Sequence, residues 1–284
     1  MAPEPHPRPV LLLGATGKLG RGMLAAQRGT ARIGYEIVPV ARRAGDEVLQ
    51  WAPGDPMTAL PPARAVIAAW GVTEGTSEEL AANVELARCA MEVGAATGAD
   101  MVLHMSSAAV YRPQDAPLSE DVPADPPAPY GGAKLEMEQA VIDWAARHPD
   151  GPRPILLRIG NVAGADSLFR NLKPGGTLRL DRFPDGAGPN RSYATAADIL
   201  RVCGALIAAG QGPHVLNVCA PRPTPMEEIA RAADCEVTWQ DAPETANRTV
   251  WLDTTRLSRL CTLPDEASDA EYVVQAARDS GLWP

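Results

Sequence analysis

Tyr130 and Lys134 are separated by three residues, in a segment that reads Tyr-Gly-Gly-Ala-Lys. If a helix begins here and runs through Trp144, both side chains lie on one face. An ammonium beside a phenol favours the ionised form, so it lowers the tyrosine pKa from its ordinary value of about 10. The tyrosine could then exchange a proton with a substrate hydroxyl or carbonyl group. The same spacing also occurs in ordinary helices, so other residues have to support this interpretation.

Ser107 stands at the end of a predicted strand. The apolar run Met101–Met105 predicts a buried strand, and Ser106 and Ser107 follow it directly. In parallel sheets, ligands bind beyond the carboxyl ends of the strands. Ser107 could therefore hydrogen-bond the same substrate oxygen whose proton Tyr130 moves. His104, within the run, is interpreted as a structural residue.

Three glycines, Gly14, Gly17 and Gly20, follow the first apolar run, Val10–Leu13. A pyrophosphate is bound by backbone N–H groups at a helix N-terminus that no side chain obstructs. The turn predicts a nicotinamide dinucleotide site, although its spacing is G-x-x-G-x-x-G rather than G-x-G-x-x-G, and a glycine-rich helix start can be an ordinary turn. Its place in an alternating pattern favours the dinucleotide. The other turn residues expected at the phosphates are Thr16, Lys18 and Leu19.

Two arginines, Arg42 and Arg43, end the second predicted strand. An acidic residue here would accept a hydrogen bond from the ribose 2′-hydroxyl of NAD, whereas an arginine would pair with the 2′-phosphate of NADP. Since no carboxylate is present, the sequence favours NADP, with NAD still possible. The alternative is a pair of solvated surface arginines.

Short apolar runs recur along the chain and look buried on both faces, as parallel strands are. Segments with helical character lie between them, and Thr76 with Glu79 three residues on predicts a capping box at one helix start. Alternating strands and helices predict an α/β fold of the Rossmann type, with a doubly wound parallel sheet. The predicted strands are Val10–Leu13, Ile37–Val40, Ala65–Ala69, Met101–Met105 and Ile155–Ile159.

The alternation loosens after Asn161, where glycine, proline and aspartate accumulate between residues 164 and 190. A helix over 196–209, a strand over 215–219 and a helix capped by Thr224 are predicted beyond this region. We therefore assign residues 1–165 to a dinucleotide-binding domain, to which 191–219 return. Residues 166–284 belong mainly to a smaller, C-terminal substrate-binding lobe.

The composition limits the classes of function that the protein could have. The chain has 284 residues, 45% of them hydrophobic, enough for one large core or a core with a smaller lobe. Its net charge of −9 opposes binding to nucleic acid. No apolar stretch reaches the roughly 18 residues of a membrane span, and the proline-rich start lacks the apolar core of a secretory signal, so we expect a cytoplasmic protein. Five scattered cysteines without a C-x-x-C pair favour reduced structural thiols and no metal site.

Four features together resemble an extended short-chain dehydrogenase/reductase of the NAD(P)-dependent epimerase/dehydratase family. They are the glycine turn, the segment Ser106–Tyr111, the Tyr130/Lys134 pair and the segment Leu157–Val162. The similarity covers nearly the whole chain and implies a nicotinamide-dependent enzyme with a carbohydrate-derived substrate. It also implies a homodimer, because members of the family often pair through the helices that here contain Asn83 and Tyr130.

The resemblance also implies roles for single residues. Ser107 corresponds to the catalytic hydroxyl residue, Tyr130 to the general acid/base, and Lys134 to the residue that binds the nicotinamide ribose and lowers the tyrosine pKa. Asn161 and Arg191 fall where the family commonly contacts substrate, although a loop arginine can also be merely solvated. Further positions implied at the cofactor are Asp55, Ala69, Trp70, Asn83 and Val162.

Three features depart from the family pattern. Ala108 and Ala109 follow the catalytic hydroxyl, where dehydratases have Asp-Glu, so dehydration of a nucleotide sugar is disfavoured. Trp70 stands where the family has an alanine beside the cofactor, and it either closes on the cofactor or displaces the local backbone. The region 166–190 is short for a complete nucleotide sugar, which admits a smaller carbohydrate or sugar acid.

We expect reversible hydride transfer between a nicotinamide and a carbinol or carbonyl carbon, with Tyr130 moving the proton. Net oxidation or reduction with exchangeable NADP(H) is favoured because of Arg42 and Arg43. The alternative is epimerisation of a sugar or nucleotide sugar, in which the hydride returns to the opposite face. A cofactor-binding sensor without chemistry is a third hypothesis, and the presence of the serine, tyrosine and lysine together disfavours it.

Overall fold

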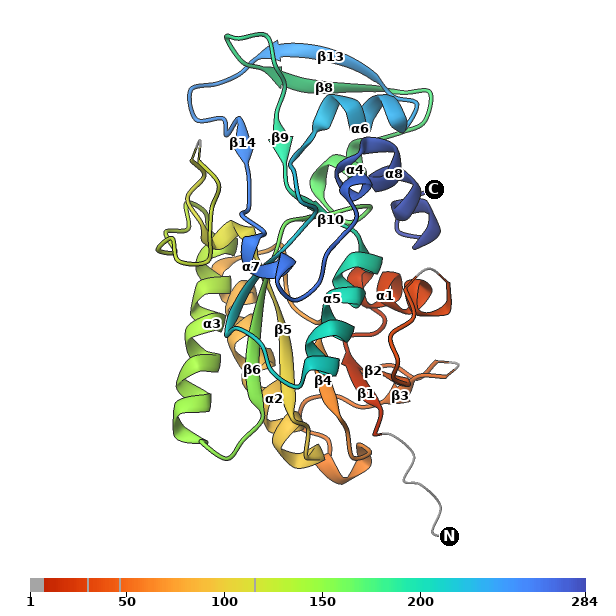
Figure 1. The fold of residues 1–284 in the computed structure, drawn as a ribbon, viewed down its shortest axis with the longest axis vertical. Coiled ribbons are helices and arrows are strands. Elements are labelled where there is room, and N and C mark those ends of the chain that lie inside the picture. Colours follow the sequence, from red (N-terminus) through yellow and green to blue (C-terminus); the bar gives the residue numbers. More distant parts are fainter. Residues whose placement is uncertain (1–7, 30, 46, 115) are drawn as a thin grey trace.

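A seven-stranded parallel sheet runs through the lower part of the molecule (Figure 1). The computed structural model describes residues 8–29, 31–45, 47–114 and 116–284. The strand order is β11-β6-β5-β4-β1-β2-β3, so the chain extends the sheet outward from β1 in both directions. This confirms the Rossmann-type, doubly wound fold. The strands are β1 (Val10–Leu13), β2 (Ile37–Ala41), β3 (Leu49–Gln50), β4 (Ala65–Ala68), β5 (Met101–Ser107), β6 (Arg153–Ile159) and β11 (Val215–Val218).

Helices cover both faces of the sheet because successive side chains of a strand point to opposite sides. Val10 and Leu12 of β1 pack toward α1 and α5, while Leu11 and Leu13 pack toward α2 and α3. A strand covered on both faces has to be apolar at every position, as β1 is. The four helices are α1 (Lys18–Arg28), α2 (Ser77–Thr97), α3 (Pro129–Arg147) and α5 (Ala196–Ala209).

The start of α2 confirms the predicted capping box. The Thr76 hydroxyl accepts a hydrogen bond from the Glu79 backbone N–H at 3.3 Å, and the Glu79 carboxylate accepts from the Thr76 backbone N–H at 2.7 Å. Two N–H groups that the helix leaves unpaired are thereby satisfied. Shorter 3-10 turns are η1 (Met57–Ala59), η2 (Ala108–Val110) and η3 (Asp265–Ser268).

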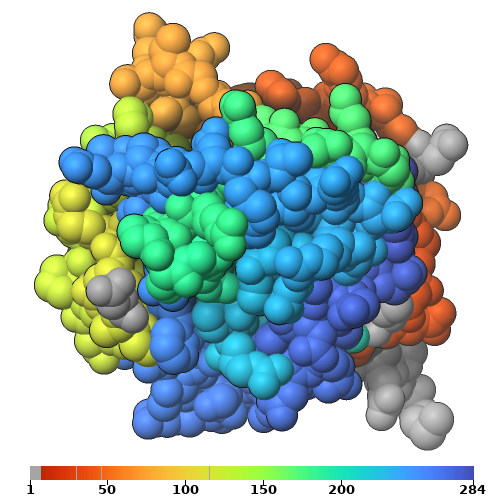
Figure 2. All heavy atoms as spheres, turned by 90° about the horizontal axis from the view of Figure 1, so that it is seen from above, coloured from red at the N-terminus to blue at the C-terminus, as the bar shows by residue number. Residues whose placement is uncertain are grey.

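A smaller lobe stands above the carboxyl ends of the strands and has its own apolar core (Figure 1). Its core includes Phe169, Leu180, Ile229 and Val273, all buried. Seen from above, green and blue segments of the second half of the chain fill the centre of this face (Figure 2). Its elements are β7 (Asn161–Val162), α4 (Ser167–Asn171), β8 (Thr177–Arg182), β9 (Asn190–Arg191), β10 (Tyr193–Ala194), β12 (Thr224–Pro225), α6 (Met226–Ala232), β13 (Glu236–Asp241), β14 (Thr249–Val250) and α8 (Ala270–Asp279). The short helix α7 (Thr255–Ser258) instead packs on β11 of the sheet.

The predicted N-cap at Thr224 is wrong. Helix α6 begins at Met226, and Pro225 occupies the cap position without a side-chain bond. The Thr224 hydroxyl instead donates to the backbone carbonyl of Ser268 at 2.8 Å, and Thr224–Pro225 pairs with β9. A tertiary partner therefore takes the hydroxyl that the local sequence assigns to the helix.

Residues 1–7, on which the expected cytoplasmic location partly rests, lie outside the described residues. Within the described ranges, none of the helices combines the length and the apolar character needed to cross a membrane.

Candidate active site

Ser107 and Tyr130 lie close together at the carboxyl end of β5. Ser107 is the last residue of β5 and caps η2, where its Oγ accepts from the Ala109 backbone N–H at 3.1 Å. Tyr130 lies in the first turn of α3, and the Ser107 side chain is close enough to lower the Tyr130 pKa. The close approach of α3 depends on Gly131, since a Cβ there would stand 2.0 Å from the Ala109 carbonyl oxygen.

Lys134 lies one helical turn below Tyr130 and is buried, with 4% of its surface exposed. Its Nζ donates to the Met105 carbonyl at 2.8 Å and contacts the Met137 Sδ at 3.8 Å. The ammonium is 6.0 Å from the centroid of the Tyr130 ring. Burial lowers the pKa of Lys134 to about 8, and the nearby Glu138 carboxylate opposes that shift.

Burial raises the pKa of Tyr130 above its ordinary value, while the hydrogen bond with Ser107 acts in the opposite direction. The net shift is upward, so the expectation that Lys134 lowers this pKa stays a prediction. The ammonium is directed at the Met105 carbonyl instead of the phenol oxygen, and removal from water disfavours the phenolate. A raised pKa suits the half of the reaction in which Tyr130 donates a proton to a carbonyl oxygen.

The glycine turn lies between β1 and α1, at the same edge of the sheet. Gly14 has a φ of +82°, a conformation that side-chain-bearing residues rarely adopt. A Cβ at Gly20 would stand 2.4 Å from the Gly14 carbonyl oxygen, so the turn closes only with glycine there. Gly17 is the N-cap of α1, and no side chain caps the helix. The first backbone N–H groups of α1 are thus left for an anion, which fits a pyrophosphate.

The other turn residues surround this helix end. Thr16 and Lys18 are exposed, and Leu19 is half-buried. Arg42 and Arg43 follow β2 and are exposed as well, on the strand adjacent to β1. Whether they face a ribose phosphate stays a prediction.

Asp55 closes the turn that follows β3. Its carboxylate accepts from the Ala52 backbone N–H at 2.8 Å. This bond explains the aspartate as a turn residue. The role expected for Asp55 at the cofactor stays a prediction.

Trp70 packs directly against the glycine turn. A Cβ on Gly14 would stand 2.7 to 2.8 Å from the Trp70 backbone N and Cα and its Cβ. The indole stacks on Trp51 with ring centroids 6.5 Å apart and an interplanar angle of 27°. Its Nε1 is buried and has no hydrogen-bond partner among the residues that the structure describes. A buried donor without an acceptor is rare in folded proteins and indicates a group that another molecule can satisfy.

Asn83 ties α2 to the loop after β4. Its Oδ1 accepts from the Val72 backbone N–H at 3.1 Å, and its Nδ2 donates to the carbonyls of Val72 at 2.9 Å and Leu80 at 2.8 Å. A Cβ on Gly71 would be 2.8 Å from Asn83 Oδ1 and 3.5 Å from Lys134 Nζ. Asn83 therefore shapes the backbone beside the ammonium. Ala69 is held on β1 by its N–H bond to the Leu13 carbonyl at 3.0 Å.

The predicted substrate residues lie where the sheet meets the lobe. Asn161 donates to the Asp166 carboxylate at 2.7 Å, and Val162 follows it in β7. Burial raises the pKa of Asp166, and hydrogen bonds from Asn161 and the Phe169 backbone oppose this shift. This arrangement leaves the Oδ1 of Asn161 as the atom expected to reach a substrate.

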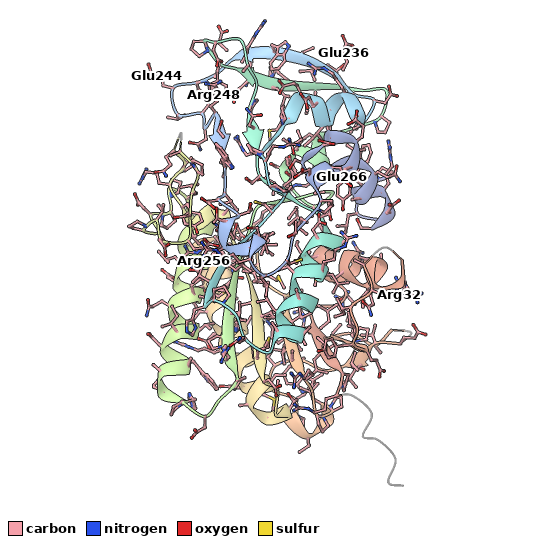
Figure 3. All side chains as sticks on the ribbon, viewed as in Figure 1. Arg32, Glu236, Glu244, Arg248, Arg256 and Glu266 are labelled. Carbon is pink, nitrogen blue, oxygen red and sulfur yellow. The ribbon has the colours of Figure 1, made fainter. Side chains whose placement is uncertain are left out.

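Arg191 is anchored by backbone groups. Its guanidinium donates to the carbonyls of Asn190 at 2.7 Å, Arg248 at 3.0 Å and Asn247 at 2.9 Å. It joins β9 to the segment before β14, near Arg248 at the top of the lobe (Figure 3). A contact between Arg191 and a substrate phosphate stays a prediction.

A buried polar network lies beneath the site, and the sequence analysis did not predict it. Glu138 and Arg158 form an ion pair whose side chains are 3% and 8% exposed. Arg158 also donates to the Tyr111 hydroxyl at 2.9 Å, which donates in turn to Asn217 Oδ1 at 2.9 Å. The only sequence signal is the position of Glu138, one helical turn beyond Lys134. His104 is buried, and burial together with Lys134 lowers its pKa to about 3.

Comparisons with known proteins identify relatives of this chain. The family model described as "NAD dependent epimerase/dehydratase family" matches residues 10–219. A UDP-glucose 4-epimerase from Azospirillum brasilense is 49% identical over 74 residues, which are 26% of this chain and 21% of that protein. One from Streptococcus mutans is 35% identical over 96 residues, 34% of this chain and 26% of that protein. The matched segments thus span about a quarter or less of these curated relatives.

Solved structures share the whole fold. The UDP-N-acetylglucosamine 4-epimerase from Bacillus cereus superposes with a TM-score of 0.76 at 17% identity, over 95% of this chain and 99% of that one. MoeE5 in complex with UDP-glucose and NAD superposes with a TM-score of 0.74 at 22% identity, over 96% of this chain and 99% of that one. At these identities the likeness concerns the fold.

Proposed function

The chain belongs to the NAD-dependent epimerase/dehydratase family of enzymes, and we propose that it is an epimerase that inverts a secondary alcohol carbon of a nucleotide sugar with the help of NAD. The observation that carries the proposal is the neighbouring pair Ser107 and Tyr130, with the buried Lys134 ammonium 6.0 Å from the Tyr130 ring centroid. The pair stands at the same sheet edge as the open N-terminus of α1. Hydride transfer from a carbinol carbon requires a proton-transfer group close to the bound dinucleotide. Here the proton-transfer group and the pyrophosphate site lie at the same edge of the sheet.

In this mechanism, bound NAD supplies a reversible hydride acceptor at the nicotinamide C4. Tyr130 takes the hydroxyl proton as the carbinol becomes a carbonyl, and returns it when the carbonyl is reduced on the other face. Ser107 donates a hydrogen bond to the same oxygen, which carries more negative charge in the transition state for reduction. Lys134 would hold the nicotinamide ribose and favour the transient phenolate by its charge.

Epimerisation is preferred over the net oxidation or reduction that the sequence analysis favours. The curated relatives that match include UDP-glucose 4-epimerases, and the solved neighbours include MoeE5 in complex with UDP-glucose and NAD. These names support a UDP-sugar as substrate and NAD as cofactor. The alanines at 108 and 109 keep a dehydratase reaction disfavoured.

Net oxidation or reduction with NADP is the second candidate, and Arg42 and Arg43 favour it. Both are exposed at the end of β2, where they could pair with a 2′-phosphate. A homodimer formed through α2 and α3 also remains part of the proposal.

The purified protein tests these alternatives. An epimerase should keep a dinucleotide through purification, and UDP-glucose should equilibrate with UDP-galactose without net absorbance change at 340 nm. Tyr130→Phe should lower turnover by about 10²- to 10⁴-fold, because it removes the proton-transfer group, while dinucleotide binding changes little. Steady NADP(H) turnover at 340 nm with exchangeable cofactor would instead establish the second candidate.

A further inference from the structure

Glu138 connects the strand that carries Ser107 to the helix that carries Tyr130 and Lys134. It lies on α3, four residues after Lys134, and is 2% exposed. Its Oε1 accepts from the Ser106 hydroxyl at 2.5 Å, and Ser106 directly precedes Ser107 on β5. The carboxylate therefore fixes the distance between the two elements that bear the reacting hydroxyls.

The same carboxylate is held by a third element. Arg158 of β6 donates to Glu138 Oε1 at 3.0 Å through Nε and to Oε2 at 2.7 Å through Nη2. Such a two-point bond sets the orientation of a carboxylate as well as its position. The Arg158 guanidinium also lies 4.8 Å from the Tyr111 ring centroid, so the pair is packed in place.

The network continues to the edge of the sheet. Asn217 of β11 donates to the carbonyls of Leu118 at 2.8 Å and Asp253 at 3.1 Å, and its backbone N–H donates to Glu120 at 2.8 Å. Arg256 of α7, labelled in Figure 3, pairs with the Glu120 carboxylate at 3.6 Å. Every member is bonded, and a fully satisfied buried network holds its members in one arrangement.

Lys134 needs a nearby negative charge to remain an ammonium in this interior. It is surrounded by Glu138 on its own helix, His104 on β5 and the phenol of Tyr130. His104 is neutral at physiological pH, because burial and Lys134 lower its pKa to about 3. Glu138 is thus the anion that acts on Lys134, and its effect opposes that of burial.

We propose that Glu138 is a positioning residue of the active site, which holds α3 against β5 and keeps the Lys134 ammonium charged for its work beside Tyr130. The proposal rests on the proposed function only in giving Lys134 and Tyr130 a catalytic purpose. The link between Glu138 and the charge of Lys134 is a property of the protein alone, so it can be tested without dinucleotide or substrate.

The titration of Lys134 can be measured directly, because the sequence contains three lysines: Lys18, Lys134 and Lys173. Protein labelled with ¹³C- and ¹⁵N-lysine gives three side-chain NMR signals, and Lys134→Arg assigns one of them. The exposed Lys18 and Lys173 serve as internal references. In Glu138→Gln we expect the Lys134 signal to titrate on the order of one pH unit lower than in the wild type.

Three further variants separate this effect from a loss of structure. Glu138→Gln leaves the Arg158 cation buried without its partner, which can unfold a protein, so Glu138→Gln/Arg158→Met removes both charges. We expect the same downward shift in this double variant. Glu138→Asp keeps the charge and should return the titration toward that of the wild type. Glu85→Gln, which breaks the exposed pair with Arg88 on α2, is the matched control and should leave Lys134 unchanged.

A Lys134 titration that is unchanged in folded Glu138→Gln would overturn the proposal, as would a Glu138→Asp variant that behaves like Glu138→Gln. The pH dependence of NAD binding provides the functional readout. The pH above which NAD binding weakens should fall in the variants by the same amount as the pH at which Lys134 titrates. If the wild type binds no NAD, the proposed function fails, while the NMR titration still decides whether Glu138 sets the charge of Lys134.

Discussion

A large aromatic residue, Trp70, stands beside the glycine turn at the point where β4 and β1 lie side by side. The connections from these neighbouring strands leave in opposite directions, which is where open α/β sheets bind their ligands. Trp70 is packed on Gly14 and stacked on Trp51, so its ring stays at this point. The sequence identified the residue as unusual, but only the structure shows that its indole N–H lacks a partner within the described ranges.

Replacement of Trp70 should show whether that N–H serves the dinucleotide. Trp70→Phe keeps an aromatic ring against Trp51 and removes the donor, so we expect NAD affinity to fall by roughly five- to tenfold, the effect of one hydrogen bond. Isothermal titration calorimetry measures the change. Trp144→Phe, on the opposite end of α3, is the control and should bind NAD as the wild type does. Equal or tighter binding by Trp70→Phe would show that the tryptophan obstructs the cofactor.

At the scale of elements, α2 supports the site through one side chain. Two hydrogen bonds between Asn83 and Val72 hold the loop after β4, and this loop borders the Lys134 ammonium. Asn83→Leu leaves the backbone N–H and carbonyl of Val72 without partners, which should lower the free energy of unfolding by about 1–3 kcal/mol.

Urea unfolding of Asn83→Leu measures that loss, and NAD titration measures the effect on the site. We expect weaker NAD binding in the folded variant, because the loop beside Lys134 is released. Thr76→Ala is the matched control on the same helix. It removes the exposed cap, so it should cost about 1 kcal/mol of stability and leave NAD binding intact.

Some helices and strands could be predicted from the sequence, and others could not. The strands of the sheet are apolar at nearly every position, so their order along the chain and the glycine turn could be predicted. The ribbon of β8 and β13 could not, because its buried residues, such as Leu178 and Leu180, alternate with charged ones in a region rich in turn residues. Glu138 and Arg158 were missed because a charged residue is ordinarily exposed, and only the tertiary partner shows otherwise.

At the scale of the whole molecule, the sheet encloses a titratable group in its interior. His104 of β5 is 1% exposed, and its Nε2 contacts the Met91 Sδ of α2 at 3.2 Å. Its pKa is lowered from 6.5 to about 3, by burial first and by Lys134 second. The folded protein therefore keeps the imidazole neutral over a pH range in which the unfolded chain takes up a proton. Stability that is fully present above pH 6.5 is lost as the pH falls toward 3.

This linkage predicts how acid destabilises the fold. Between pH 7 and pH 5, His104 takes up most of one proton in the unfolded chain and almost none in the folded protein. This difference lowers the free energy of unfolding by about 2 kcal/mol over that interval. His104→Leu fills the same apolar position without a titratable group, so its stability should change by about 2 kcal/mol less over that interval. Urea unfolding of both proteins at the two pH values measures the difference. An identical pH dependence in the two proteins would mean that His104 is protonated in the folded state, and the sheet interior would then have to accommodate its charge beside Lys134.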